Sequence, residues 1–142
     1  MADIRFNDNL AIGALHYCLS NSTDLTLKIF SGTLPGSWSA GMSSSSWTPS
    51  DGIKLLEFED SQISIDTATG EVTTTASYAE TGVNATATCF KLSGDAFGYM
   101  LGTVGTSGTD LLISNATINQ SQGYRHTLSG LVLRLPQSTT VT

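Results

Sequence analysis

The most suggestive chemical group in this sequence is a small acidic cluster of Glu57, Glu59 and Asp60. On a strand, Glu57 and Glu59 would share one face about 6.5–7 Å apart. Glycoside hydrolases use a carboxylate pair at a comparable separation as acid and base or nucleophile. Those pairs flank their substrate from separate elements of a deep cleft, whereas these residues are neighbours on one strand. The sequence therefore favours a solvated face of an edge strand over a catalytic pair.

The glycine-rich segment GTVGTSG, residues 102–108, is a second candidate. It lacks the GxGxxG spacing and the GK[ST] ending of phosphate loops, and it joins two expected strands instead of preceding a helix. A glycine stands directly beside Ser107, so the segment also differs from the GxSxG nucleophile elbow. We interpret it as a hairpin turn in which glycines supply positive φ angles.

Neither the histidines nor the cysteines form a recognisable reactive group. The sequence suggests no Ser or Asp partner for His16 or His126, so structural or surface roles are favoured. Cys18 and Cys89 could form a disulfide, but the N-terminus lacks a secretory signal, which favours buried free thiols. There is no CxxC motif, and a zinc site is not expected. We therefore predict no catalytic residues, no metal and no cofactor, and we do not expect an enzyme.

Composition narrows the class of protein further. The 142 residues carry a net charge of −6, and the six basic side chains are scattered along the chain. Nucleic-acid binding needs a concentrated cationic surface, and anionic membranes would repel this chain, so neither partner is expected. Charged residues make up 13% and hydrophobic residues 39%, which does not fit disorder. No apolar stretch approaches the length of a membrane span.

Alternation of apolar and polar residues predicts an all-β fold, an antiparallel β-sandwich of about eight strands. In residues 24–30, Leu25, Leu27 and Ile29 would share one face. Residues 86–92 and residues 71–78 are each expected to form one strand. We expect one domain over residues 1–142: an N-terminal segment (1–23) with a short helix at 10–19, the sandwich (24–136) and a polar tail (137–142).

A long Ser- and Gly-rich connection, residues 37–51, interrupts this pattern and contains Trp38, Met42 and Trp47. Connections of this length in compact domains are usually functional or disordered. Tryptophan and methionine are enriched at interfaces, so the segment could be a contact surface. Alternatively, both tryptophans fold back and cover the edge of the sandwich. The sequence does not decide between the two.

Four segments in order resemble the head decoration (cement) proteins of tailed phages. They read LKIFSGTLP, ATATCFKL, GTVGTSGTDL and LVLRLP, at residues 27–35, 85–92, 102–111 and 131–136. The resemblance implies a jelly-roll-like β-sandwich that binds the outside of an icosahedral capsid and cements neighbouring capsomers. It also implies the major capsid protein as partner, a dimer or trimer on the virion exterior, and synthesis in the host cytoplasm.

We expect the capsid contacts to be Phe6 in the N-terminal segment together with Trp38, Met42 and Trp47. The main alternative is a receptor- or glycan-binding β-sandwich of a tail fibre or adhesin, in which exposed aromatic rings stack on sugars. The candidate rings would then be Trp38, Trp47, Tyr78, Tyr99 and Tyr124. A hydrolase that uses Glu57 and Glu59 is the third and weakest possibility.

Overall fold

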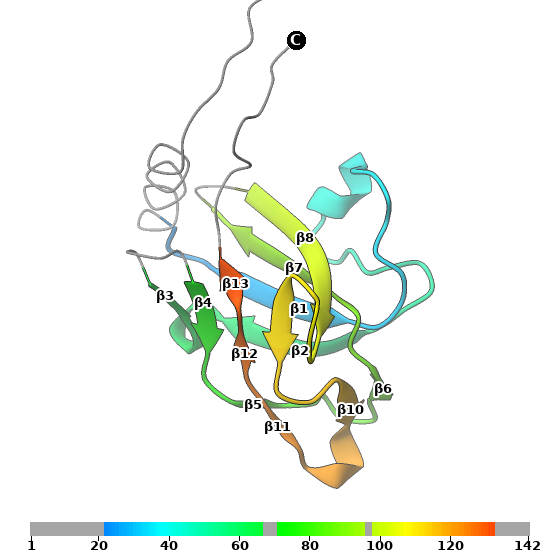
Figure 1. Ribbon diagram of the computed structural model, residues 1–142. Helices are drawn as coiled ribbons and strands as arrows, with labels where there is room; N and C mark the ends of the chain where they lie inside the picture. Colours follow the sequence, from blue (N-terminus) through cyan, green and yellow to red (C-terminus); the bar gives the residue numbers. More distant parts are fainter. Residues whose placement is uncertain (1–21, 67–70, 96–97, 133–142) are drawn as a thin grey trace, which may run out of the picture.

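A computed structural model describes residues 22–66, 71–95 and 98–132. Within these ranges the chain forms thirteen short strands and three 3-10 helices (Figure 1), which confirms the all-β prediction. The expected helix at residues 10–19 lies outside the described residues, as do the polar tail, Phe6, His16 and Cys18.

One six-stranded sheet forms the frame of the molecule, in the order β12-β9-β8-β7-β1-β2. Its central strands are long enough to alternate fully between two faces, and β2 lies at one edge. We call it the main sheet. Its strands are β1 (Thr26–Phe30), β2 (Lys54–Glu59), β7 (Cys89–Gly94), β8 (Gly98–Gly105), β9 (Leu111–Ile113) and β12 (Leu128–Ser129).

Three smaller sheets complete the fold, and Figure 1 shows them beside and below the main sheet. One has three strands in the order β13-β4-β3, and the others are the pairs β10-β6 and β11-β5. Their strands are β3 (Ile63–Ile65), β4 (Glu71–Thr74), β13 (Leu131–Val132), β6 (Asn84–Thr86), β10 (Thr117–Asn119), β5 (Ser77–Tyr78) and β11 (Arg125–His126).

The hydrophobic core lies on one face of the main sheet, where the small sheets cover it. The predicted face of Leu25, Leu27 and Ile29 is confirmed, because all three side chains are buried in this core. The small sheets add Val72 from β4 and Ile118 from β10. The period of two thus places every second side chain of β1 against the small sheets. We call the opposite side of the main sheet its outer face.

The structure corrects the expected number of strands, thirteen in the described residues instead of about eight. Residues 86–92 are not one strand, because the chain changes partners at Ala87 and Thr88. The Ala87 N–H donates to Ala116 O, and the Thr88 N–H donates to Phe30 O on the main sheet. Residues 71–78 divide in the same way into β4, which pairs with β3 and β13, and β5, which pairs with β11.

The prediction that residues 102–108 form a hairpin turn is wrong. Strands β8 and β9 run parallel, with Val104 opposite Leu111, so the sheet is not antiparallel throughout. The Asp110 carboxylate fixes the connection by accepting hydrogen bonds from the Thr103 N–H and Oγ1, both at 2.9 Å. Of the three glycines in the segment, only Gly108 has a positive φ, 67°.

Candidate functional site

The acidic cluster lies on the edge of the main sheet, as the sequence indicated. Glu57 and Glu59 belong to β2, and the Glu57 carboxylate accepts a hydrogen bond from Lys54 Nζ at 2.6 Å. Lys54 also forms an ion pair with Glu80 at 2.9 Å. The hydrogen bond to Glu57, and to a smaller extent the one to Glu80, raise the pKa of Lys54. The carboxylate of Glu57 is therefore part of a salt-bridged strand edge.

His126 is a fully buried side chain of β11. Its Nδ1 lies 3.1 Å from the backbone oxygen of Asn115, so Nδ1–H donates and the ring is the neutral Nδ1–H tautomer. The buried Nε2 has no hydrogen-bond partner within the described residues. Burial lowers the pKa of His126, and the Asn115 hydrogen bond opposes that shift. Of the two roles expected for this histidine, structural or surface, its burial excludes the surface one.

This buried imidazole predicts a loss of stability in mild acid. Because the folded pKa lies below the usual 6.5, the unfolded chain binds a proton first as the pH falls. Between about pH 7 and pH 5 the free energy of unfolding should therefore decrease, by up to about 1.4 kcal/mol per pH unit. Urea titrations across this range measure the slope. His126→Asn, which keeps a donor near Asn115 O and cannot titrate, should flatten it; an unchanged slope would contradict the assignment.

Of the two cysteines, only Cys89 lies within the described residues. Cys89 is a buried free thiol, and burial raises its pKa, while Cys18 lies outside the described residues. Within the described ranges, no group of three or more His, Cys, Asp or Glu side chains is arranged to bind a metal ion. No helix in that part of the chain is long and apolar enough to cross a membrane.

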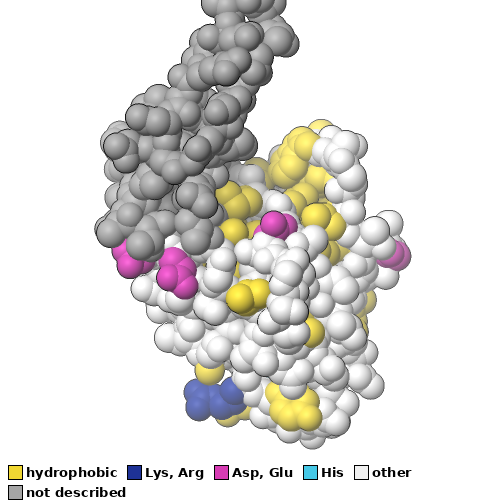
Figure 2. Space-filling model, viewed as in Figure 1, with side chains coloured by type: hydrophobic (Ala, Val, Ile, Leu, Met, Phe, Trp, Pro, Cys, Tyr) yellow, Lys and Arg dark blue, Asp and Glu magenta, His cyan; other side chains and the backbone are white. Residues whose placement is uncertain are grey.

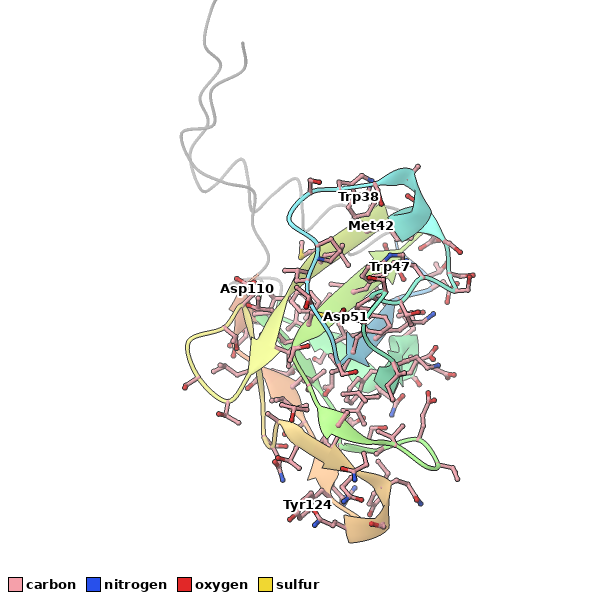
Figure 3. The ribbon with its side chains drawn as sticks, turned by 90° about the vertical axis from the view of Figure 1, so that its right-hand side faces the viewer. Trp38, Met42, Trp47, Asp51, Asp110 and Tyr124 are labelled. Carbon is pink, nitrogen blue, oxygen red and sulfur yellow. The ribbon has the colours of Figure 1, made fainter. Side chains whose placement is uncertain are left out.

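The long connection between β1 and β2 folds onto the outer face of the main sheet (Figure 3). The ring of Trp47 meets Phe30 of β1 edge-on, with centroids 5.5 Å apart and an interplanar angle of 79°. Met42, in the 3-10 helix Ala40–Ser43, is only 3% exposed. We call residues 33–51 the covering loop, because it shields Phe30 and Cys89, which lie outside the main core.

Hydrogen bonds close the covering loop at its base. The Asp51 carboxylate accepts from the Thr33 N–H at 2.9 Å and from Thr33 Oγ1 at 2.6 Å. These two bonds lower the pKa of Asp51. Just beyond the two ends of the loop, Ser31 and Ile53 are also hydrogen-bonded to each other. The Ser31 N–H donates to Ile53 O, and the Ile53 N–H donates to Ser31 Oγ, both at 3.0 Å. The loop is thus an Ω-like segment whose two ends are held together.

Two lysines hold the far part of the covering loop against the sheet. Lys28 on β1 and Lys91 on β7 are direct cross-strand partners. Lys28 Nζ donates to Ser45 O at 2.5 Å, and Lys91 Nζ donates to Ser44 O at 2.6 Å. Burial, and then the charge of Lys28, lower the pKa of Lys91. The loop carbonyls thus receive hydrogen bonds from two like charges that would otherwise destabilise the strand pair.

The covering loop and β8 together present an exposed pair of aromatic rings. Trp38 is 52% exposed and Tyr99 is 43% exposed, with ring centroids 6.2 Å apart and planes tilted by 33°. A pocket of about 270 Å³ runs under this pair. Figure 2 shows hydrophobic side chains gathered on this part of a surface that is otherwise largely uncharged. We call Trp38 and Tyr99 the aromatic ledge.

The structure separates the four residues expected to contact a capsid. Trp38 is exposed, Trp47 is half-buried and Met42 is buried, whereas Phe6 lies outside the described residues. Trp47 folds back and covers the sheet, whereas Trp38 does not, so the alternative in which both tryptophans fold back is wrong for Trp38. A contact role for Trp38 stays a prediction. From the sequence alone Tyr99 is only a glycan-stacking candidate, and its pairing with Trp38 cannot be predicted because 61 residues separate the two.

Comparisons with known proteins add no relatives to this description. No family model, no curated protein and no solved structure matches this chain. The resemblance to head decoration proteins therefore stays a prediction.

Proposed function

We propose that this chain is a structural virion protein that binds the outer surface of an icosahedral phage capsid and cements neighbouring capsomers. Its partner would be the major capsid protein, with the chain present as a dimer or trimer on the capsid exterior. In this proposal the main sheet and the small sheets are the two layers of a jelly-roll-like sandwich. No catalytic role is proposed.

The aromatic ledge is the observation that carries the proposal. Tryptophan and tyrosine are enriched among the residues that dominate binding energy at protein interfaces. Trp38 is presented by a loop held by Asp51 at its base and by Lys28 and Lys91 farther along. A preorganised loop loses little conformational freedom on binding, which favours affinity. The ledge therefore has the composition and the rigidity expected of a protein-contact surface.

On a capsid, a contact surface as small as the aromatic ledge can be sufficient. Each subunit buries few residues, but links repeated over a closed shell act together through a high effective concentration. A protein that binds the assembled lattice and not its separated parts stabilises the lattice by mass action. Internal DNA pressure would then have to break many such links at once.

Replacement of Trp38 with serine should remove the protein from capsids without unfolding it. Trp38 is exposed, so its loss should change the free energy of unfolding by less than about 0.5 kcal/mol. Loss of a central tryptophan from an interface typically costs more than about 2 kcal/mol, so occupancy on particles that lack the protein should fall at least about tenfold. Quantitative gel analysis of sedimented particles measures the bound copies.

The matched control is Tyr124→Ser, which removes an aromatic ring of similar exposure, 41%, at the opposite end of the molecule (Figure 3). This variant should bind capsids like the unchanged protein. Equal occupancy of the Trp38→Ser variant and the unchanged protein would remove the ledge from the proposed interface.

A further inference from the structure

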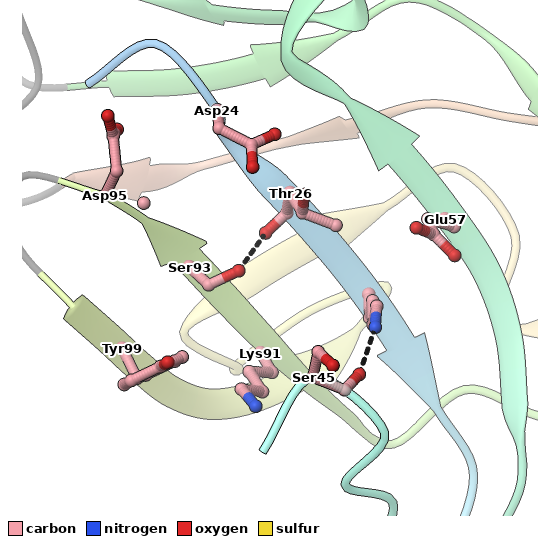
Figure 4. A pocket seen from close by; sticks show the side chains of 10 residues that line it. Asp24, Thr26, Ser45, Glu57, Lys91, Ser93, Asp95 and Tyr99 are labelled. Carbon is pink, nitrogen blue, oxygen red and sulfur yellow. Dashed lines mark hydrogen bonds between the residues drawn. The ribbon is translucent and has the colours of Figure 1, made fainter. Parts of the chain in front are cut away.

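A polar groove crosses the outer face of the main sheet beside the aromatic ledge (Figure 4). It has a volume of about 400 Å³ and runs over β8, β7, β1 and β2, so its floor is the rigid centre of the sheet. Tyr99 lines it together with Thr26 and Ser93. The size falls in the range typical of pockets for small ligands.

Several polar groups in this groove have unused hydrogen-bonding capacity. Within the described residues, no hydrogen bond is made by the Asp24 carboxylate, by Thr26 Oγ1 or by the Tyr99 hydroxyl. Lys91 is not among these groups, because its side chain is 3% exposed and its Nζ donates to Ser44 O and lies over the Tyr99 and Trp47 rings. Asp95 accepts two hydrogen bonds, both from Thr23. The groove therefore offers donors and acceptors together, next to an exposed aromatic ring.

We propose that this groove binds a short neutral oligosaccharide. A pyranose ring carries hydroxyl groups that both donate and accept hydrogen bonds. Stacking on Tyr99 is not part of the proposal, since Lys91 Nζ lies over that ring, 4.7 Å from its centroid, and Trp38 packs against it at 6.2 Å. Asp24, Glu57 and Asp95 would accept from these hydroxyls, while the hydroxyl groups of Thr26 and Tyr99 would donate to them. The recognition of a polyol needs both kinds of partner, and the groove supplies both.

The mixed charges of the groove select the class of ligand. An anionic sugar or a nucleotide would be repelled by Asp24, Asp95 and Glu57 and by the net charge of −6. A basic peptide would suit these carboxylates but would meet Lys28 and Lys91 on the groove floor. A neutral ligand avoids both penalties, because its hydroxyl groups can pair with either kind of side chain. The groove shares Tyr99 with the ledge, but the residues changed to test it, Asp24 and Thr26, lie outside the ledge, so the two proposals can fail separately.

A glycan array carrying neutral, amino and anionic glycans, probed with the full-length chain, tests the assignment first. We expect saturable binding to neutral glycans that is nearly independent of salt, because no net charge is neutralised on binding. Array binding only to anionic or amino glycans, or to none, would overturn the proposal. So would a basic peptide that binds the groove more tightly than the best neutral glycan.

Titration of the best neutral oligosaccharide by calorimetry then locates the site. Thr26→Val removes a hydroxyl that makes no hydrogen bond and keeps the β-branched shape, so the fold should be unchanged. Asp24→Ala removes an exposed carboxylate. Each variant should weaken binding about tenfold. Thr127→Val and Tyr124→Ser, outside the groove, are the matched controls and should bind normally. Unchanged affinity in both groove variants would overturn the proposal, whatever the Trp38→Ser variant does on capsids.

Discussion

Replacement of Gly52 with alanine is expected to lower the free energy of unfolding by about 2–3 kcal/mol and to release the covering loop. A Cβ at this position would stand 1.9 Å from Ser31 O and 2.5 Å from Ser31 C. Both atoms belong to the backbone, so no side-chain rotation can relieve the overlap. The strand ends would have to separate, which breaks the hydrogen bonds between Ser31 and Ile53 and displaces Asp51 from Thr33.

Chemical denaturation and tryptophan fluorescence measure this effect, since Trp47 packs on Phe30 only while the covering loop is in place. Gly36→Ala and Gly41→Ala provide matched controls in the same loop. A Cβ at either position meets nothing within 4 Å, so these variants should stay within about 0.5 kcal/mol of the unchanged protein. A Gly52→Ala protein as stable as these controls would show that the base of the loop is not a rigid closure.

The second large effect is expected at the contact between Phe90 and Gly102, which are cross-strand partners on β7 and β8. Phe90 is fully buried, so Phe90→Ala should cost about 3–5 kcal/mol through lost burial and the cavity that remains. A Cβ at Gly102 would lie 2.5 Å from Phe90 Cε1 and 2.8 Å from Phe90 Cζ. Gly102→Ala should therefore cost about 1–3 kcal/mol by overpacking.

The two changes should be strongly non-additive. Removal of the Phe90 ring makes room for the new methyl group, and the methyl group fills part of the cavity. The double variant should therefore be more stable than the sum of the single effects predicts, by about 0.5–3 kcal/mol. A double-mutant cycle in urea measures this coupling. Strict additivity would mean that Gly102 is required for another reason, such as the Asp110 carboxylate, whose Oδ2 a Cβ at Gly102 would meet at 3.0 Å.

Alternation alone predicts the buried face of residues 24–30, whereas both faces of β7 are buried. Leu25, Leu27 and Ile29 lie in the core because side chains alternate between the two faces of a strand. When one face is buried, every second residue must therefore point into the core. The edge position of Glu57 was predictable for a related reason, since charged side chains on an edge strand discourage edge-to-edge pairing. These properties depend only on neighbouring residues.

Features that depend on distant partners could not be predicted in this way. The division of residues 86–92 follows from bonds of Ala87 to Ala116 and of Thr88 to Phe30, neither of which is encoded locally. The parallel course of β9 after the 102–108 turn likewise depends on Asp110 reaching back to Thr103. A glycine-rich turn signal marks where the chain bends but not the direction in which it leaves.

The candidate site shows the same limit. Lys91 lies on the strand face opposite Phe90 and Leu92, yet its side chain too is only 3% exposed. The covering loop buries Lys91. The position of this loop depends in turn on Lys28 and Lys91 and on the Thr33–Asp51 contact. The pairing of Asp and Thr recurs at Thr23–Asp95 and Thr103–Asp110, over sequence separations of 72 and 7 residues. Such spacings provide no pattern that a single sequence could reveal.

The most direct test of the proposed function is the number of copies of this chain relative to the major capsid protein in purified virions of the phage that the proposal requires. Quantitative mass spectrometry with labelled reference peptides measures this ratio. A capsid decoration protein should be present at a fixed ratio set by the capsid lattice, and it should be lost from particles when it carries Trp38→Ser. A few copies per particle, as for a tail or fibre component, or the absence of the chain from virions would contradict it.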